Sequence, residues 1–464
     1  MSATMTFRER IQEKYDEIKK VYFNDDRPWI IGYSGGKDST TILQLIYNSL
    51  TELPPEKLHK PVYIISSDTL VENPLILDFV NFNMDKLNDS FGPYSDIFKA
   101  RMVRPNYNNS FWTLLIGKGY PSPRQKFRWC TDRLKIAPTD QFIKSTIDEF
   151  GEAIVVLGVR RSESSSRAGT IASHSIEGKI LKRHTTTSNA YVYAPIEDFT
   201  LDDVWNYLQR SKNPWGGDNK KLLSLYTSSQ DTSECPMQID KDAPSCGNSR
   251  FGCWVCTVVK EDKSLTGFIR SGHNELKPLL DFRKRLYDMR DLPENRMKHR
   301  MGGEIYFVKT KEGKKRGLGP YTLNARKEIL KDLLRSEKQY NAMATVKMDL
   351  IAKEELQLIR EHWIAAGDLE DSLPRIYESI TGNPFDESFD EIPLFSLNEI
   401  RTLHTVCADE KIDPSLINQL IELEKEYYGT RYRSHILSKM DKILKQDWLH
   451  EDIILEEAGD HHDY

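Results

Sequence analysis

The sequence predicts an α/β protein: a parallel, Rossmann-like sheet comes first, a loop-rich region with cysteines follows, and an all-helical part ends the chain. Short apolar runs that end in Gly, Ser or Asp predict the parallel strands, and helical spacing follows the first two of them. These runs are Trp29–Ile31, Pro61–Ser66 and Ala153–Val159. In the last part of the chain, apolar residues recur at helical spacing and no strand pattern is present, which predicts an all-helical structure there. We therefore expect three domains, at residues 1–210, 211–316 and 317–464.

Composition is that of an ordinary globular protein, with 39% apolar and 29% charged residues in a chain of 464. The net charge of −5 is uneven, because residues 449–464 carry six acids and no Lys or Arg, so that the remainder sums to +1. We expect this acidic tail to be disordered. Phe98–Lys135 holds nine Lys or Arg against one Asp, and Asp281–Arg316 holds twelve against six acids. Such blocks suit a polyanion, although solvated basic faces are also common.

No apolar run approaches the length that a bilayer requires, and the first residues alternate charged and apolar side chains at helical spacing. The sequence therefore predicts a cytoplasmic protein without a membrane partner.

The stretch Ser34–Ser39 joins the first predicted strand to the first helix. Its residues are Ser34, Gly35, Gly36, Lys37, Asp38 and Ser39. Adjacent glycines let backbone amides approach a ligand, and the helix that follows directs its positive dipole end to the same point, so phosphate binding is predicted. The spacing excludes a GxxxxGK[ST] loop. A tight turn with an incidental lysine is the alternative.

Polar side chains follow two further strands. Ser67 and Asp68 end the second, and Gly158, Arg160 and Arg161 end the run at Ala153–Val159. Ligands of parallel sheets lie beyond the carboxyl ends of the strands, so these residues should face one crevice with the glycine loop. Asp68 then suits a ribose or Mg²⁺, or it caps the next helix. The two arginines suit phosphate groups.

Five of the six cysteines lie between Cys130 and Cys256, and without an export signal they indicate thiol or metal chemistry rather than disulfides. Basic neighbours of Cys130 favour its thiolate, as a sulfur nucleophile or carrier requires, although a buried structural cysteine is the alternative. The other four lie in the loop-rich region, with ten, six and two residues between them, and predict a metal centre of zinc or iron–sulfur type. They are Cys235, Cys246, Cys253 and Cys256.

Beyond Gly302 we expect helices interrupted by a connector at Gly367–Pro393, which contains prolines. The sixth cysteine, Cys407, lies in one of these helical patterns and is expected in the core. The predicted helices are Thr322–Asn341, Lys353–Ala366, Leu397–Ala408, Ser415–Tyr428 and His435–Trp448.

With these motifs in hand, the chain resembles the phosphoadenosine phosphosulfate reductase superfamily, whose N-type ATP pyrophosphatases carry a loop like SGGKDS. The resemblance covers roughly Arg27–Trp205 and implies a sheet of the adenine nucleotide alpha-hydrolase type. Within the superfamily, the chain is most similar to the DndC family, the ATP pyrophosphatases of DNA phosphorothioate modification, and the related SspD proteins share these motifs. The closer likeness rests on the segments CTDRLKIAP, PIEDFTLDDVW, CGNSRFGCWVC and GLGPYTLNAR.

The resemblance implies that Ser34–Ser39 holds the β,γ-pyrophosphate of ATP, with Lys37 countering its charge and Asp38 helping to hold Mg²⁺. Ser67, Asp68, Gly158 and Arg160 would border the adenosine and the α-phosphate. The family reaction is adenylation of an oxygen, here of a DNA backbone phosphate, followed by attack of persulfide sulfur and loss of AMP. DNA, a cysteine desulfurase as sulfur donor and other phosphorothioation proteins are the implied partners.

Family likeness also favours a [4Fe–4S] cluster over zinc on the four clustered cysteines. Sulfonucleotide reductases carry a cysteine pair where this chain has Trp129 and Cys130, so Cys130 is either a cluster ligand or the thiol that handles sulfur. We assign it to sulfur handling, because the spacing of the other four can close a site by itself.

Other functions fit the same motifs. A tRNA thiolase also combines this loop with an iron–sulfur cluster, a sulfonucleotide reductase would use the fold without ATP, and a scaffold would keep a vestigial site. The complete Ser34–Ser39 loop argues against the scaffold.

Overall fold

The computed structural model describes residues 6–163, 180–184, 187–229, 251–310, 313–368, 370–385, 397–410, 412, 414–427 and 435–445. By their contacts, the residues form two compact units. Unit 1 comprises Met1–Asn106 and Pro123–Leu276, and unit 2 comprises Tyr107–Ser122 and Lys277–Tyr464. The boundaries predicted at residues 210 and 316 mark changes in sequence character, and neither coincides with the division at Leu276.

Unit 1 is built on a six-stranded sheet with the order β3-β2-β1-β4-β6-β5. All neighbouring strands are parallel except β5, which runs antiparallel to β6. The predicted Rossmann-like α/β sheet is therefore confirmed. The strands are β1 (Trp29–Gly32), β2 (Val62–Ser67), β3 (Phe98–Val103), β4 (Ala153–Val156), β5 (Lys182–Arg183) and β6 (Ala190–Tyr193).

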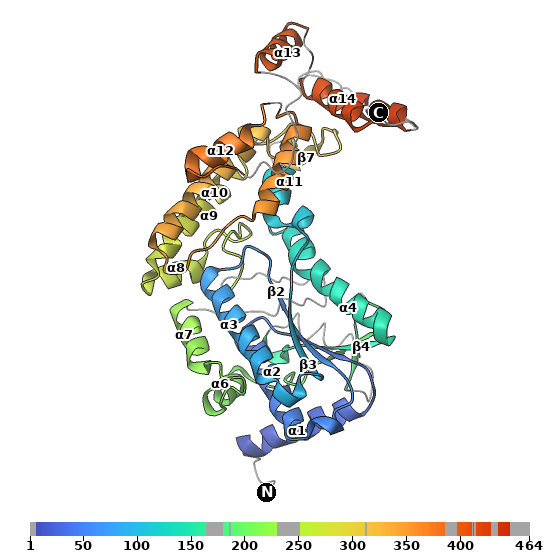
Figure 1. The fold of residues 1–464 in the computed structure, drawn as a ribbon, viewed down its shortest axis with the longest axis vertical. Helices are drawn as coiled ribbons and strands as arrows, with labels where there is room; N and C mark the ends of the chain where they lie inside the picture. The colour runs from blue at the N-terminus through green and yellow to red at the C-terminus, as the bar shows by residue number, and fades with distance from the viewer. Residues whose placement is uncertain are drawn as a thin grey trace. The chain divides into compact units, whose positions relative to one another are not determined.

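Helices cover both faces of this sheet, which is seen between α3 and α4 in Figure 1. One face packs Ile30, Tyr63 and Val155 against Ile143 of α4. Alternate strand residues point to the opposite face, where Trp29 contacts Tyr22 of α1 with ring centroids 5.5 Å apart. Because both faces are buried, the central strands β1 and β4 are apolar without alternation. The helices of unit 1 are α1 (Phe7–Phe23), α2 (Lys37–Thr51), α3 (Pro74–Ser90), α4 (Ala137–Phe150), α6 (Leu201–Arg210), α7 (Asn219–Ser229) and α8 (Lys263–Arg270).

The order of the strands reverses direction at β1 and β4. From β1 the chain moves outward through β2 to β3, and it then returns to the other side of β1 as β4. The carboxyl ends of β1 and β4 therefore diverge into loops on opposite sides of one crevice, which is the usual ligand position in such sheets.

Residues 107–122 leave unit 1 and belong to the core of unit 2. They include the π-helix Thr113–Gly117, in which the amide of Lys118 donates to the carbonyl of Thr113. The indole of Trp112 donates to the carbonyl of Leu350 at 2.7 Å, and the indole of Trp363 donates to Ile116 at 2.8 Å. Both tryptophans are fully buried.

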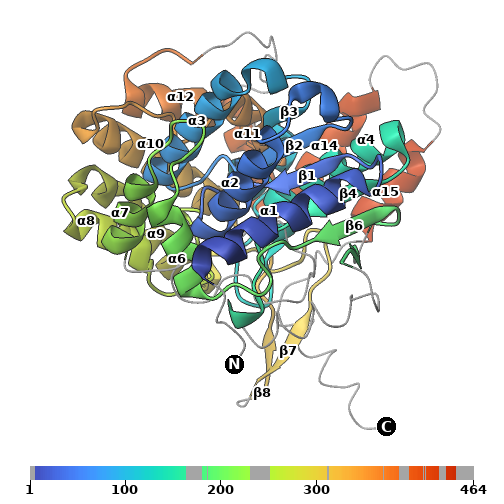
Figure 2. The ribbon, with the colours of Figure 1, turned by 90° about the horizontal axis from the view of Figure 1, so that it is seen from below.

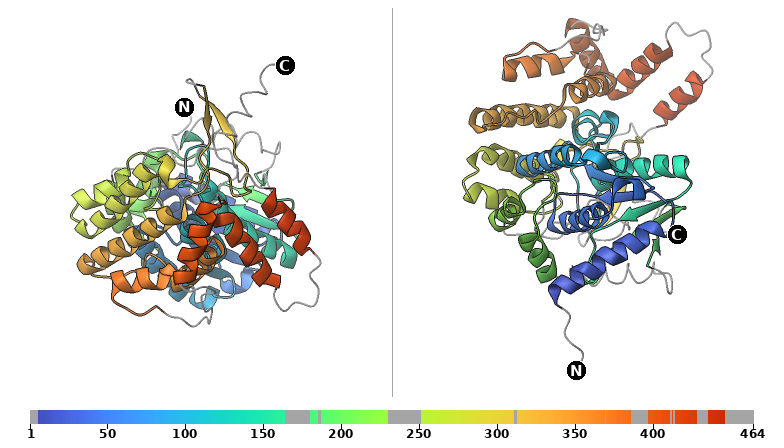
Figure 3. Two further views of the ribbon diagram at one scale, coloured as in Figure 1. Left: turned by 90° about the horizontal axis from the view of Figure 1, so that it is seen from above. Right: turned by 60° about the horizontal axis from the view of Figure 1, so that its bottom comes forward.

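The described part of unit 2 is otherwise helical, apart from a two-stranded ribbon that Figure 2 shows as β7 and β8. Its helices from α9 onward run from yellow to red in Figure 3. The helices predicted beyond Gly302 are confirmed within a few residues, and Cys407 is buried as expected. The elements are α9 (Lys277–Met289), β7 (Phe307–Thr310), β8 (Gly313–Arg316), α10 (Leu323–Met343), α11 (Lys353–Ala365), α12 (Ser372–Thr381), α13 (Leu397–Asp409), α14 (Pro414–Tyr427) and α15 (Ile436–Leu444).

Two expectations about irregular segments are wrong. The connector Gly367–Pro393 contains α12, because Pro374 lies in its first turn, where a missing amide costs no hydrogen bond. The region Ser211–Cys256 contains α7, whose buried residues Leu222 and Tyr226 are one helical turn apart. Within the described parts of the chain, no helix is both long and apolar enough to cross a membrane. The acidic tail lies outside them.

Candidate nucleotide site

The glycine loop lies between β1 and α2, as the sequence predicts. Gly35 has a φ of +70°, and a Cβ at this position would lie 2.5 Å from Cγ2 of Val80. Both facts require glycine. The hydroxyls of Ser34 and Ser39 lie 3.1 Å apart across the loop, and Ser39 also donates to the carbonyl of Gly36 at 3.0 Å. The loop is therefore pinned by its own serines at the start of the helix.

Three charged side chains are buried beside this loop. Nζ of Lys37, which is 1% exposed, lies 3.0 Å from Oδ2 of Asp38. Nε of Arg160 donates to Oδ1 of the same carboxylate at 2.6 Å, and Arg160 also reaches Ser162 at 3.1 Å. Two cations and one anion leave a buried excess of one positive charge. Since burial of uncompensated charge is costly, this arrangement suits an incoming anion.

Gly158, beyond the end of β4, brings Arg160 to the loop. A Cβ on Gly158 would lie 2.9 Å from the carbonyl carbon of Asp38 and 3.1 Å from the amide of Ser39. Only glycine therefore permits the two loops to touch. This contact joins the carboxyl ends of β1 and β4 at the point where the strand order reverses.

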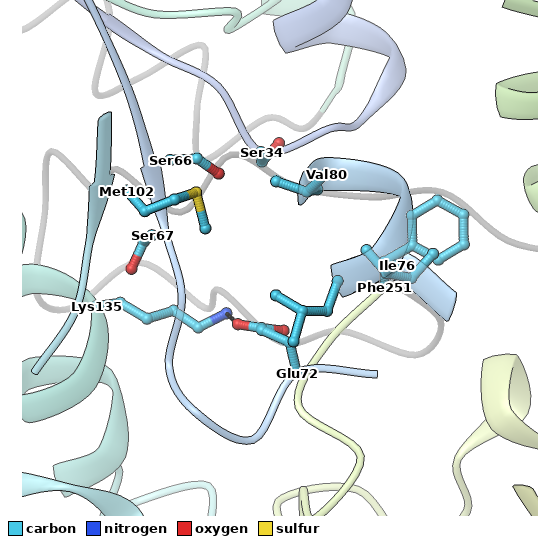
Figure 4. A pocket seen from close by; sticks show the side chains of 10 residues that line it. Ser34, Ser66, Ser67, Glu72, Ile76, Val80, Met102, Lys135 and Phe251 are labelled. Carbon is cyan, nitrogen blue, oxygen red and sulfur yellow. Dashed lines mark ion pairs between the residues drawn. The ribbon is translucent and has the colours of Figure 1, made fainter. Parts of the chain in front are cut away.

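A hollow opens beside the loop, at the carboxyl ends of β2 and β3 (Figure 4). Its walls combine hydroxyls with apolar side chains, as nucleoside pockets do. The buried hydroxyl of Ser67 has no hydrogen-bond partner among the residues that the structure describes. The lining residues are Ser34, Ser66, Ser67, Glu72, Ile76, Leu77, Val80, Met102, Lys135 and Phe251.

Asp68 and Arg161 already have partners. The carboxylate of Asp68 accepts from the amide of Leu70 at 2.9 Å and from Nε of Arg104 at 2.9 Å. Leu70 has a φ of +66°, an unusual conformation for this residue type. Arg161 has a side chain 66% exposed and pairs with Glu197, away from Asp38. Of the two predicted phosphate arginines, Arg160 alone meets the loop.

The carboxylate of Asp38 is occupied on both oxygens, by Lys37 and by Arg160. As a ligand of Mg²⁺ it would have to exchange one of these partners for the ion. Mg²⁺ is commonly held by one or two carboxylates together with substrate phosphates, so Asp38 fits that role only with a nucleotide present.

Cys253 and Cys256 form one tight turn, with the amide of Cys256 donating to the carbonyl of Cys253 at 3.1 Å. Sγ of Cys253 lies 3.4 Å from the hydroxyl of Thr69 and 4.0 Å from Oε1 of Glu72. Burial raises the pKa of the Cys253 thiol, and the neighbouring charges of Glu72 and Cys130 raise it further. Cys130 lies at the start of the π-helix Thr131–Ile136.

The predicted ligands Cys235 and Cys246 lie outside the described residues. Among the residues that the structure does describe, no three His, Cys, Asp or Glu side chains are arranged to hold a metal ion. The turn of Cys253 and Cys256 fits two thiolate ligands of one centre.

The structure adds residues that the sequence reading missed. Lys135 and Glu72 form an ion pair of 3.5 Å at the pocket wall, and Glu72 accepts from Thr69 at 2.9 Å. Glu72 thus touches both the hollow and Cys253. Tyr226 of α7 accepts a hydrogen bond from the amide of Lys37 at 3.1 Å. The segment CTDRLKIAP contains Lys135, but no local pattern marked Tyr226.

Residues 28–258 match the family of phosphoadenosine phosphosulfate reductase domains. This range holds the sheet, the glycine loop, Arg160 and the cysteines from Cys130 to Cys256. The chain therefore contains a domain of this family.

One relative is an uncharacterized protein, MJ0066, of Methanocaldococcus jannaschii, 26% identical over 243 residues. The match covers 52% of this chain and 39% of that protein, so the chain spans about two fifths of the relative's length.

Two solved structures are distantly similar. The U34-tRNA thiolase NcsA from Methanococcus maripaludis, solved with its [4Fe-4S] cluster, is 12% identical with a TM-score of 0.28 over 61% of this chain and 81% of that one. The Candida glabrata FMN adenylyltransferase with FAD and inorganic pyrophosphate is 16% identical with a TM-score of 0.26, over 45% and 60%. Because both TM-scores are low, the fold is assigned from the strand order and strand directions of the sheet, and not from these two structures.

Proposed function

We propose that this chain binds ATP at the Ser34–Ser39 loop and cleaves it between the α and β phosphates to activate an oxygen for replacement by sulfur. The observation that carries the proposal is the buried, net positive group of Lys37, Asp38 and Arg160 at the end of β1. It lies where the strand order reverses and beside a hollow lined by hydroxyls. The match to a sulfonucleotide-processing family supports the same chemistry.

In the proposed reaction, the acceptor oxygen attacks the α-phosphorus, and the bond to the bridging oxygen of the β-phosphate breaks. The leaving pyrophosphate gains negative charge, which Lys37 and the amides at the start of α2 stabilise. Arg160 and the hydroxyls of Ser34 and Ser39 orient the phosphates. The products of this step are an adenylated acceptor and pyrophosphate.

The acceptor that we propose is a DNA backbone phosphate, as in DNA phosphorothioate modification. A persulfide sulfur attacks the activated phosphorus, AMP departs with the former non-bridging oxygen, and a second thiol reduces the remaining S–S bond. Cys130, which precedes the π-helix whose Lys135 lines the hollow, is proposed to carry that sulfur. A cysteine desulfurase would load it, and a [4Fe–4S] cluster is proposed on the four later cysteines.

The first test is pyrophosphate release from ATP by purified protein supplied with DNA. Lys37→Ala should reduce the rate by at least about a hundredfold, because the buried cation opposite the leaving group is lost. Lys20→Ala is the matched control, since Lys20 is exposed at the end of α1, and it should leave the rate unchanged. No release by the wild-type protein would remove the ATP assignment.

The acceptor is tested separately, by mass spectrometry of DNA and tRNA from cells that lack the gene. Loss of DNA phosphorothioate supports the proposal. Loss of thiolated tRNA with intact DNA phosphorothioate would show that the acceptor of the same chemistry is RNA and not DNA.

A further inference from the structure

Tyr226 occupies a position where a phosphate would be expected. The amide of Lys37, the first residue of α2, donates to the hydroxyl of Tyr226 at 3.1 Å. The N-cap Gly36 has no side chain to accept from the first amides of the helix. In a phosphate-binding loop these amides donate to the ligand. The tyrosine hydroxyl therefore holds a donor that the proposed function assigns to ATP.

The ring of Tyr226 also contacts the site. Nζ of Lys37 lies 5.3 Å from its centroid, a cation–π contact that helps to hold the buried ammonium group. Phe251, which lines the hollow, packs against the same ring at 4.7 Å, and Trp205 packs against it at 5.2 Å. Tyr226 is only 7% exposed. Tyr226 thus packs against Phe251, which lines the hollow, and contacts the glycine loop at Lys37.

The helix that carries Tyr226 is held at its other end. Asn219, the first residue of α7, exchanges hydrogen bonds with Gln44 of α2 and donates to the carbonyls of Leu208 and Ser211. Tyr226 lies two turns further along α7. The start of α7 is therefore attached to α2, independently of the contacts that Tyr226 makes.

We propose that Tyr226 is a positioning residue that holds the place of a nucleotide phosphate: its hydroxyl accepts from the amide of Lys37 until a phosphate oxygen replaces it. This inference rests on the proposed function. ATP and the hydroxyl compete for one donor, so binding of pyrophosphate or ATP displaces the hydroxyl, while the ring keeps its contact with Lys37.

The test is the affinity for inorganic pyrophosphate with Mg²⁺, measured by titration calorimetry on the full chain. Tyr226→Phe keeps the ring contacts and leaves the amide of Lys37 without its acceptor, so pyrophosphate should bind about three- to tenfold more tightly. Tyr47→Phe is the matched control. Tyr47 is also 7% exposed and lies on α2, but its hydroxyl donates to the carbonyl of Ser90. It should leave the affinity unchanged.

Hydrogen exchange of residues 219–229 gives a second readout. In the wild type, pyrophosphate should accelerate exchange in the last turns of α7, and in Tyr226→Phe the exchange should already be fast without it. Equal or weaker pyrophosphate binding by Tyr226→Phe would overturn the inference, since a hydroxyl that binds the phosphate itself predicts weaker binding. If the wild type and Lys37→Ala bind pyrophosphate equally, or neither binds it, the proposed function itself fails.

Discussion

In unit 1, Lys37, Asp38 and Arg160 are buried as ions that touch one another, whereas in unit 2 Glu355 and Arg326 are buried without an ionic partner among the described residues. Glu355 accepts from the amide of Ala352 at 2.9 Å at the start of α11. Arg326 donates to the carbonyl of Gly117 at 2.6 Å, at the end of the π-helix Thr113–Gly117.

The two regions differ in what burial does to their charges. In unit 2, burial raises the pKa of Glu355 to about 7 and lowers the pKa of Arg326 to about 10, and both side chains satisfy helix ends. In unit 1 the two cations share one carboxylate, so the three side chains are in contact and carry one net positive charge. In unit 2, perturbed pKa values therefore mark groups at helix ends, whereas in unit 1 paired charges mark the glycine loop of the candidate site.

The largest expected effect comes from removing the shared carboxylate of unit 1. Asp38→Ala leaves Lys37 and Arg160 buried together without a counter-charge, so the free energy of unfolding should fall by about 3–5 kcal/mol. Denaturant unfolding measures it. Arg161→Ala, which breaks an exposed pair with Glu197, should cost under about 1 kcal/mol and is the control. Equal losses of stability in the two variants would show that Asp38 does not stabilise the buried side chains of Lys37 and Arg160.

The second prediction concerns pH and unit 2. The pKa of Glu355 is about 7 in the folded chain, against an ordinary value of 4.5 for a glutamate in water, so the folded state binds more protons between these values. Stability from this group is full below about pH 4.5 and is lost as the pH rises through 7, by at most about 3 kcal/mol. Glu355→Gln keeps an acceptor for Ala352 but cannot ionise.

Unfolding of Glu355→Gln between pH 5 and 8 should therefore depend less on pH than that of the wild type, and the variant should be the more stable one at pH 8. His362 acts in the opposite sense, because burial lowers its pKa to about 4 and stability from this group rises between pH 4 and 6.5. Measuring His362→Gln in parallel separates the pH dependence that His362 causes from the pH dependence that Glu355 causes. A variant at Glu355 with the pH profile of the wild type would contradict the assignment.

Local pattern predicted the Ser34–Ser39 loop, the ends of β2 and β4, and Gly158, because glycine, serine and charge after an apolar run are properties of neighbouring residues. It did not predict Tyr226, which lies 189 residues from its partner Lys37 in a stretch where periodicity fades. Nor did it predict that Trp112 would bond to Leu350, 238 residues away. Which distant segment covers a site depends on tertiary packing, which a local pattern does not record.

The pairing of Asp68 with Arg104 shows the same limit. The sequence places Asp68 at the end of β2, and this is correct, but the arginine follows β3, the neighbouring strand. Strand order decides which charges meet, and the order of β3 and β2 was not predicted.

The third prediction compares one glycine in each unit. Gly158→Ala places a Cβ 2.9 Å from the backbone of Asp38, which cannot yield, so the loops must separate and the free energy of unfolding should fall by about 1–3 kcal/mol. Gly117→Ala first meets side-chain atoms of His362 and Ile359, at 3.2 and 3.4 Å, and it should cost under about 1 kcal/mol. Pyrophosphate binding should weaken in the first variant alone. Equal binding in both would mean that the contact of Gly158 with Asp38 does not position the loop.

The smallest expected loss of stability comes from removing a helix cap, and it should differ between the caps of α6 and α10. Thr200 at the start of α6 accepts from the amide of Asp203, whose carboxylate accepts from the amide of Thr200 in return. Thr322 at the start of α10 accepts from the amide of Ala325 without a reciprocal bond. Thr200→Ala should therefore cost about 1–2 kcal/mol, and Thr322→Ala about 0.5–1 kcal/mol.

Thermal unfolding of the two cap variants also tests whether the units unfold together. If each unit melts by itself, Thr200→Ala shifts only the transition of unit 1 and Thr322→Ala only that of unit 2, whereas one cooperative transition shifts in both variants. A larger loss from Thr322→Ala would contradict the ranking, because it would make a single hydrogen bond at α10 worth more than the reciprocal pair at α6.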